Sequence, residues 1–455
     1  MVAYGPAHRA APRKRSSMTV RGRDTRDGER GQILALMVIS LLAIGALVAV
    51  AADTGFFFDY RRRMQSGADS AAMAGAEQLL RDLMSDTNVQ TAGLKAAESN
   101  GFKNGVDDAQ VTIHHPPVNG FYADRADKNN FVEAVIFQPR PTIFMAILGF
   151  QSATVSARAV AGIKGSDLCI LAQNPTITKA INMNGGFTID AHCRVASNSS
   201  DNDALDDSGG ACMTATSIAV TGTPGGNSTC FTPTPKSYVP REPDPFAGVA
   251  APRFALPCNA VDCTIDNTSS SYSSCKINNS GTYTLSPGVY CGGINIQGSS
   301  GCGTDVTFRP GTYVLYGGGF NVNGSCLHGA GVTFYNTGTT SGTTKYGTVT
   351  VRGTVQGALY APTSGPLTAI LFFQDRTFSG GQDNVVNGST GLTLQGTLYF
   401  PTTPVRFAGG ASSTGAAAYT ILIADTITFT GGATFSDDFS SLPDGSPSKA
   451  VALAE

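Results

Sequence analysis

The residues of this chain whose chemistry is easiest to interpret are ten cysteines, all of which lie between positions 169 and 326. An even number of cysteines confined to one region predicts disulfide bonds made in an oxidising compartment. A zinc site is the alternative, but no two cysteines have CxxC spacing and the five histidines are scattered. The sequence leaves the disulfide pairing open. The candidates are Cys169, Cys193, Cys212, Cys230, Cys258, Cys263, Cys275, Cys291, Cys302 and Cys326.

Charged side chains in the second half of the chain offer little for catalysis. Between residues 280 and 435, Asp375 and Arg376 form the only adjacent pair of opposite charge, and a surface ion pair or a turn is the favoured interpretation. The remaining acids and bases follow no repeating register, and no glycine-rich phosphate loop precedes a helix. We therefore predict that the chain is not an enzyme and has neither catalytic residues nor a cofactor.

Two clusters resemble metal ligands. The acidic run from Asp201 to Asp207 could hold calcium, but it has no closing glutamate at EF-hand spacing, so a solvated acidic loop is favoured. His114 and His115 are adjacent, and adjacent residues of an extended segment point to opposite faces. They are therefore poorly placed to bind one ion together, and no metal site is predicted.

Twenty uncharged, mostly apolar residues, Ile33 to Ala52, are long enough to cross a bilayer core of about 30 Å. The first thirty residues hold eight basic and three acidic side chains, which predicts a cytoplasmic N-terminus. Cleavage after Ala49-Val50-Ala51 would instead release a secreted protein. The apolar run is longer than a usual signal core of about 7–15 residues, so a retained anchor is favoured.

The chain divides into four parts by composition. Residues 1–30 are predicted to be a disordered cytoplasmic tail and residues 31–53 a transmembrane helix. Residues 54–163 should form a membrane-proximal helix, extending to about position 84, and a small α+β domain with strands near 109–113, 131–137 and 153–160. Between the last two strands, residues 142–150 are predicted to be a short apolar helix or a membrane-surface segment.

The membrane-proximal helix carries small residues at spacings that place them on one face. Such a face allows close packing against another helix, and we expect it to bind a partner of the chain. The predicted partner-binding residues are Gln65, Ala68, Asp69, Ala71, Ala72, Ala74 and Gly75.

Residues 164–455 are rich in Gly, Ser, Thr and Asn, and short motifs recur along them. Similar sequences recur at fixed offsets. The segment Leu285–Tyr290 has a similar segment 23 residues later, Gly293–Gly298 has one 26 residues later, and Gln356–Pro362 has one 39 residues later. Repeats of about 20–50 residues without helices predict a stacked architecture, in which apolar residues of successive coils meet. The favoured fold class is therefore mainly β, a right-handed parallel β-helix (solenoid) with disulfides, and a β-sandwich is the alternative.

The segment 30–77 resembles the N-terminal region of TadG-like proteins of the Flp/Tad pilus-assembly system. The resemblance lies in Arg30-Gly31-Gln32, the apolar run, Tyr60–Arg63, and the small-residue segment Gln65–Ala76. It implies an envelope protein anchored in the inner membrane that supports assembly of a thin adhesive pilus. Many members carry a von Willebrand A domain with a DxSxS metal motif. Asp444–Ser448 matches those letters, but it lies too near the chain end for such a domain. Pilin-like relatives that are cleaved after a glycine have glutamate as the fifth residue of the mature chain. The fifth residue after Gly31 is Leu36, so no prepilin-type cleavage is predicted.

The expected function is that of a membrane-anchored structural component of Flp/Tad-type pilus assembly. The expected partners are the inner membrane and other pilus-assembly membrane proteins or pilin-like subunits, with cell-wall or surface polysaccharide also open. The part of the chain after the tail carries a formal charge of −7, which argues against nucleic acid. The runner-up is a cell-envelope adhesin or glycan-binding β-helix independent of pili. The C-terminal domain should be periplasmic or extracellular.

Overall fold

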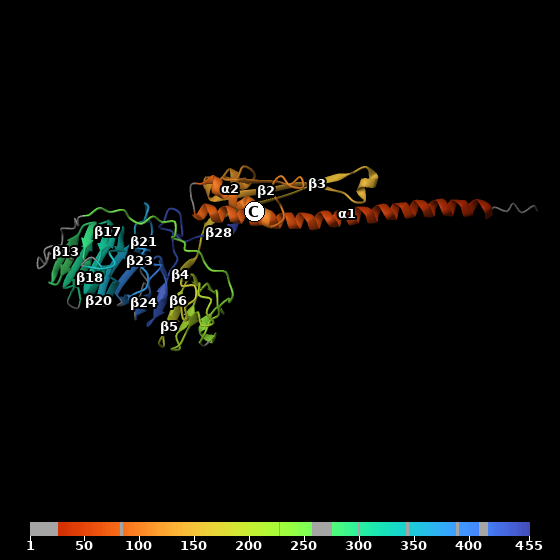
Figure 1. The fold of residues 1–455 in the computed structure, drawn as a ribbon. Helices are drawn as coiled ribbons and strands as arrows, with labels where there is room; N and C mark the ends of the chain where they lie inside the picture. The colour runs from red at the N-terminus through yellow and green to blue at the C-terminus, as the bar shows by residue number, and fades with distance from the viewer. Residues whose placement is uncertain are drawn as a thin grey trace, which may run out of the picture.

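The computed structural model describes residues 26–81, 85–226, 228–256, 275–298, 301–342, 345–387, 391–408 and 417–455. Helix α1 (Arg26–Arg81) is one continuous helix of 56 residues, about 84 Å long at the usual helical rise. Its first half projects alone from the rest of the molecule (Figure 1). From Ile33 onward it is long and apolar enough to cross a membrane, as the sequence predicts. Most of the tail predicted to be disordered, residues 1–25, lies outside the described residues.

The second half of α1 packs against a small unit made of α2 (Asp86–Ser99) and an antiparallel sheet. The sheet has the order β1-β2-β3-β28, and Figure 1 shows β2 and β3 running beside α1. Its strands are β1 (Gln110–His114), β2 (Phe131–Pro141), β3 (Ser152–Gly165) and β28 (Lys449–Leu453). Short 3-10 turns η1 (Phe121–Ala123) and η2 (Lys128–Asn130) precede β2, and η3 (Met145–Leu148) lies between β2 and β3. The first three strands lie where alternating apolar residues predict them.

The last strand of the chain belongs to this membrane-proximal sheet. β28 pairs antiparallel with β3, and Lys449 lies opposite Gly165. The division of the sequence at 163/164 placed this strand with the C-terminal domain. The β-rich domain is thus inserted between two neighbouring strands of the membrane-proximal unit.

The β-rich domain contains a 20-stranded sheet in which every described pairing is parallel. One ladder runs β10-β7-β4-β25-β23-β21-β19-β17-β14. A second runs β8-β5-β26-β24-β22-β20-β18-β15-β12. The strands are β4 (Leu168–Ala172), β5 (Ile181–Met183), β7 (Arg194–Ser197), β8 (Leu205–Asp206), β10 (Ser217–Val220), β12 (Cys275–Ile277), β13 (Gly281–Leu285), β14 (Gly288–Cys291), β15 (Ile294–Gln297), β16 (Thr304–Phe308), β17 (Gly311–Tyr316), β18 (Phe320–Ala330), β19 (Val332–Thr337), β20 (Val349–Tyr360), β21 (Ile370–Gln374), β22 (Asn384–Asn387), β23 (Gly391–Phe400), β24 (Val405–Ala408), β25 (Thr420–Ala424) and β26 (Ile427–Phe429).

A further parallel sheet has the order β11-β9-β6-β27. Its strands are β6 (Thr188–Ala191), β9 (Cys212–Thr214), β11 (Phe231–Thr232) and β27 (Ala433–Phe435), and the turn η4 (Ser228–Cys230) precedes β11. We call the sheets of parallel strands together the β-stack. Mostly β content with parallel sheets agrees with the sequence prediction, and parallel pairing differs from the antiparallel sheets of a β-sandwich.

Apolar residues at equivalent positions of successive strands form columns within the β-stack. In the second ladder one column is buried along its whole length, and its pairings follow the repeated apolar-polar-apolar motif. Its members are Ile277, Ile296, Val322, Val351, Val386, Phe407, Phe429 and Met183. Each short strand buries little by itself, so the neighbours on both sides supply the apolar surface that makes it stable.

The chain enters the β-stack in the middle rather than at an end. β4 has β25 on one side and β7 on the other, so residues 168–232 build outward in one direction. The chain then crosses the β-stack through residues 233–256, the crossing segment, and resumes at the opposite end with β12. From there it winds back until β25 meets β4. Figure 1 shows the two halves of the β-stack, yellow-green and cyan-blue, side by side.

The crossing segment covers the outer face of the middle of the first ladder. β19, β21 and β25 are buried at every position. The ring of Phe254 lies over Tyr316 and Tyr335, and Phe246 lies 5.6 Å from Tyr399. A strand covered on both faces loses the apolar-polar alternation of a half-exposed strand, which accounts for the continuous run Ile370–Phe373.

Candidate functional site

The small-residue face of α1 is the site that the sequence predicts for partner binding. In the structure Ala68, Ala71 and Ala72 are wholly buried, and they pack within the chain's own membrane-proximal core. This face thus packs against α2 and the sheet of the same chain, and its use by a partner stays a prediction. A partner could reach these three side chains only if α2 or the sheet moved away.

Two glycines show how closely the elements approach each other at this face. A Cβ atom built on Gly75 would lie 2.8 Å from Cγ1 of Val132 on β2. One built on Gly93 of α2 would lie 2.9 Å from the side chain of Ile113 and 3.2 Å from the carbonyl oxygen of Ala71. Such distances leave no room for a larger side chain. The small residues are needed for the fold of this unit, whatever else they do.

The polar members of the predicted site lie at the rim of the buried face. Gln65 donates hydrogen bonds to Asp69 at 2.8 Å and to the carbonyl oxygen of Arg158 on β3 at 2.9 Å. Gln65, Asp69 and Ala74 are half-buried, and they keep surface that another molecule could contact. Partner binding through these rim residues stays a prediction.

A buried carboxylate fastens the membrane-proximal sheet to the end of the chain. The side chain of Glu133 on β2 is fully buried, and it accepts hydrogen bonds from Arg158 and from the backbone N–H of Val118. Arg158 also forms an ion pair at 2.7 Å with Glu455, the last residue. Burial by itself raises the pKa of Glu133, but these hydrogen bonds outweigh it, so the pKa lies below its ordinary value of 4.5.

The junction between the apolar run and the folded unit is formed by Asp53. Its side chain is 2% exposed. The carboxylate accepts hydrogen bonds from the backbone N–H groups of Ile143, Phe144 and Met145 at 3.1, 3.0 and 2.6 Å. It thereby supplies acceptors at the start of η3, where a turn leaves N–H groups without partners. From the sequence, Asp53 could be recognised only as the end of the anchor, because no local motif indicates a contact with a segment ninety residues away.

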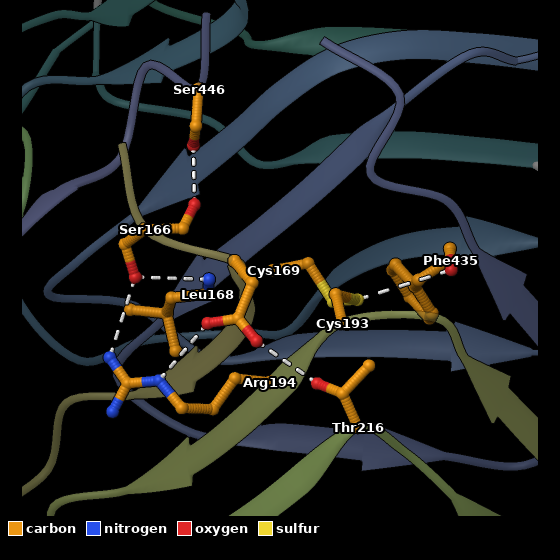
Figure 2. Close-up of a disulfide and its surroundings, with 9 residues drawn as sticks. Ser166, Leu168, Cys169, Cys193, Arg194, Thr216, Phe435 and Ser446 are labelled. Atoms are coloured by element: carbon orange, nitrogen blue, oxygen red, sulfur yellow. Dashed lines mark hydrogen bonds and ion pairs between the residues drawn. A yellow bond between two sulfur atoms is a disulfide. The ribbon is translucent and has the colours of Figure 1, made fainter. Parts of the chain in front are cut away.

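The cysteines form disulfides between neighbouring rungs of the β-stack. Cys169 pairs with Cys193, Cys212 with Cys230, and Cys302 with Cys326. Figure 2 shows the first of these beside the cluster of Ser166 and Arg194, with the Sγ of Cys193 near the carbonyl oxygen of Phe435. Cys275 and Cys291 are also disulfide-bonded. The predicted disulfides are confirmed for these eight residues, and Cys258 and Cys263 lie outside the described residues.

The acidic run from Asp201 to Asp207 contains an internal ion-pair network. In the acidic run, the ammonium group of Lys179 lies 2.9 Å from Asp206 and 3.7 Å from Asp203, where a bound cation would otherwise balance the charge. Within the described ranges, no group of three or more His, Cys, Asp or Glu residues is placed to hold a metal ion. The acidic run is therefore balanced by a lysine rather than simply solvated.

Arg376 lies in the turn that follows β21, as the sequence suggests, and its side chain holds the crossing segment. It donates to the carbonyl oxygens of Phe246 and Val249 and, at 2.7 Å, to the hydroxyl of Tyr399. Tyr399 in turn donates to Asp244. Burial, reinforced by the Asp244 carboxylate, raises the pKa of Tyr399. The sequence could not reveal this network because Arg376 and Tyr399 are more than a hundred residues from the crossing segment that they bind.

Comparison with known proteins identifies the N-terminal region. Residues 31–78 match the family of putative Flp pilus-assembly TadE/G-like proteins, and residues 74–161 match the putative Tad-like Flp pilus-assembly family. No curated protein matches the chain. Among solved structures, the competence-associated pilin ComZ from Thermus thermophilus aligns over 90% of this chain and 96% of its own, with 12% identity and a TM-score of 0.28. A likeness with so low a TM-score carries no structural argument.

The two family matches together span α1 from the apolar run onward, α2 and strands β1 to β3, which is the unit that the small-residue face and Glu133 hold together. The resemblance predicted from the apolar run and the segment Gln65–Ala76 is thereby confirmed. Residues 31–161 of this chain are thus similar to the Tad regions of TadE/G-like Flp pilus-assembly proteins.

Proposed function

We propose that this protein is a membrane-anchored structural component of Flp/Tad-type pilus assembly. The apolar half of α1 spans the inner membrane with the N-terminus in the cytoplasm, and the membrane-proximal unit and β-stack lie on the opposite side. The observation that carries the proposal is the agreement between the Tad matches and one structural unit. In that unit the anchor continues without a break into the folded domain.

A rigid anchor has a mechanical consequence for assembly. Because α1 is one helix packed against α2 and the sheet, the membrane fixes the height and the tilt of the folded unit. A pilus subunit or assembly protein that contacts the rim residues Gln65, Asp69 and Ala74 would then be held at a set distance from the bilayer. The β-stack, which we propose closes into a right-handed parallel β-helix, would present a rigid surface further out.

The experiment compares piliation in cells lacking the protein and in cells that regain variants of it. The chain offers a clean internal deletion, because Gly165 and Lys449 are paired neighbours and a short turn can replace residues 166–448. The full chain should restore pili and fractionate with the inner membrane. The deleted variant reports whether the membrane-proximal unit suffices or the β-stack is also needed. Normal pili in cells without any copy would overturn the proposed function.

A hollow on the β-stack favours glycan binding as a second candidate. It has a volume of about 590 Å³ and is lined by polar groups that include Asn321 and Gln382. Beside them the rings of Tyr346 and Phe378 stack at 4.7 Å between centroids. An aromatic floor with polar groups around it suits a ligand that has both apolar and hydroxylated faces. Binding of purified protein to peptidoglycan, lost in Gln382→Ala but kept in Gln297→Ala, an exposed residue outside the hollow, would support this candidate.

A further inference from the structure

We propose that the tip of the β2–β3 hairpin, residues 142–150, enters the lipid boundary beside the anchor and forms a second membrane contact. The tip lies level with the end of the apolar run of α1. Asp53, which binds the N–H groups at the start of the tip, is the first charged residue after the apolar run. In Figure 1 the β2–β3 hairpin extends along α1 toward its projecting half. The tip therefore meets the membrane surface where the anchor leaves it.

The side chains of the tip are those of a lipid contact. Ile143, Phe144, Ile147 and Phe150 are 56%, 40%, 84% and 60% exposed, and Ile147 is the most exposed large apolar side chain in the described part of the chain. No residue between 142 and 150 is charged. An exposed cluster of this kind, next to a membrane-spanning helix, is costly in water and favourable in lipid.

The backbone of the tip is also suited to an apolar medium. In a bilayer, an N–H group without a partner is expensive, because no water is present to accept its hydrogen bond. Asp53 satisfies three N–H groups of the tip, and carbonyl oxygens within the segment or next to it satisfy four more. The four bonds run from Thr142 to Gln151, Ile147 to Phe144, Gly149 to Ala146 and Phe150 to Met145. The tip can thus lose water without leaving these groups unpaired.

The surroundings of the tip match the layer of lipid headgroups. Phe56 and Phe58 are 59% and 67% exposed, and aromatic side chains are favoured at membrane interfaces. The exposed Arg61 and Arg62 follow one to two turns later, within reach of lipid phosphates. Between α1 and β3, a groove of about 380 Å³ is lined by Phe57, Phe58 and Arg61. The order away from the membrane is thus the apolar tip, then the aromatic side chains Phe56 and Phe58, and then the basic side chains of Arg61 and Arg62.

The test uses the absence of tryptophan from the sequence, so one introduced indole reports on one site. Full-length Ile147→Trp is compared with full-length Tyr238→Trp, a control on the crossing segment where the native side chain is 80% exposed. Both replace exposed side chains, so neither disturbs the core. Each protein is placed in vesicles of phosphatidylcholine and phosphatidylglycerol, with and without lipids brominated at shallow acyl positions.

Ile147→Trp should emit at shorter wavelength than the control, and brominated lipid should quench a severalfold larger fraction of its emission. Emission and quenching equal to those of Tyr238→Trp would overturn the proposal. A blue-shifted emission without quenching by lipid would also overturn it, because a protein surface would then cover the tip. The measurement needs no pilus and no other assembly protein, so its result is independent of the proposed function.

Discussion

Arg158 donates a hydrogen bond from Nε to Oε1 of Glu133, and the carboxylate is fully buried while the guanidinium is only a quarter exposed. This pair joins β2 to β3 inside the membrane-proximal unit, and Arg158 extends it to the end of the chain. Removing one partner of such a pair leaves the other charge buried without compensation, which is why its effect exceeds that of a surface ion pair.

Arg158→Met should therefore destabilise the membrane-proximal unit by about 2 to 3 kcal/mol, less than a fully buried pair because Arg158 keeps some contact with water. Hydrogen exchange of the β2 and β3 amides, in full-length protein in detergent, measures this change locally. Arg81→Met is the matched control, since its ion pair with Glu77 is exposed on both sides. Equal protection in both variants would show that the Glu133–Arg158 pair contributes nothing.

The same carboxylate should make the unit sensitive to acid. The pKa of Glu133 in the folded protein is lowered, so its ionised form contributes stability that is present above the unfolded value near 4.5. That contribution is lost as the pH falls through the lower folded pKa. Glu133→Gln should thus be less stable than the native chain at pH 7, and the difference should shrink below about pH 4.5. A difference that stays constant from pH 7 to about pH 3 would contradict this role.

Arg376→Met should loosen the crossing segment without unfolding the β-stack, because it removes the donors to the carbonyl oxygens of Phe246 and Val249. Trypsin cleavage at the exposed Arg253 measures the change and should become severalfold faster. Arg406→Met is the control, since Arg406 pairs with Asp383 at the surface, away from the crossing segment. Cleavage at the native rate in Arg376→Met would mean that the aromatic contacts alone hold the segment.

Gly75→Leu tests the packing of the small-residue face. The new side chain would collide with Val132, and overpacking of this kind costs about 1 to 3 kcal/mol or more. The β2 amides should lose protection in hydrogen exchange. Gly55→Leu should leave them unchanged, because no atom lies within 4 Å of the place that a Cβ on Gly55 would occupy. Loss of a pilus partner in Gly75→Leu would then reflect a damaged fold, so partner binding is better tested at Gln65 and Asp69.

Periodicity let the sequence predict much of the β-stack. The 26-residue repeat places Ile296 on Val322, and the structure pairs these residues. The 39-residue repeat does not correspond to a strand pairing, because the ladder pairs Tyr360 with Gln395, an offset of 35 residues. Aperiodic contacts gave no such signal. The crossing segment and the Arg376 network join residues that are far apart in the sequence. No local sequence pattern indicates where such a segment will lie in the fold.

The place of β28 in the sheet also sets an order of folding events. Residues 54–165 can fold together first, but without β28 one edge of β3 has no neighbour and presents unpaired backbone groups. Only when residues 449–455 have been made can Lys449–Leu453 cover that edge and Glu455 reach Arg158. A chain cut short anywhere in the β-stack would therefore carry an open strand edge on β3. The membrane-proximal sheet is thus complete only after the whole β-stack has been made.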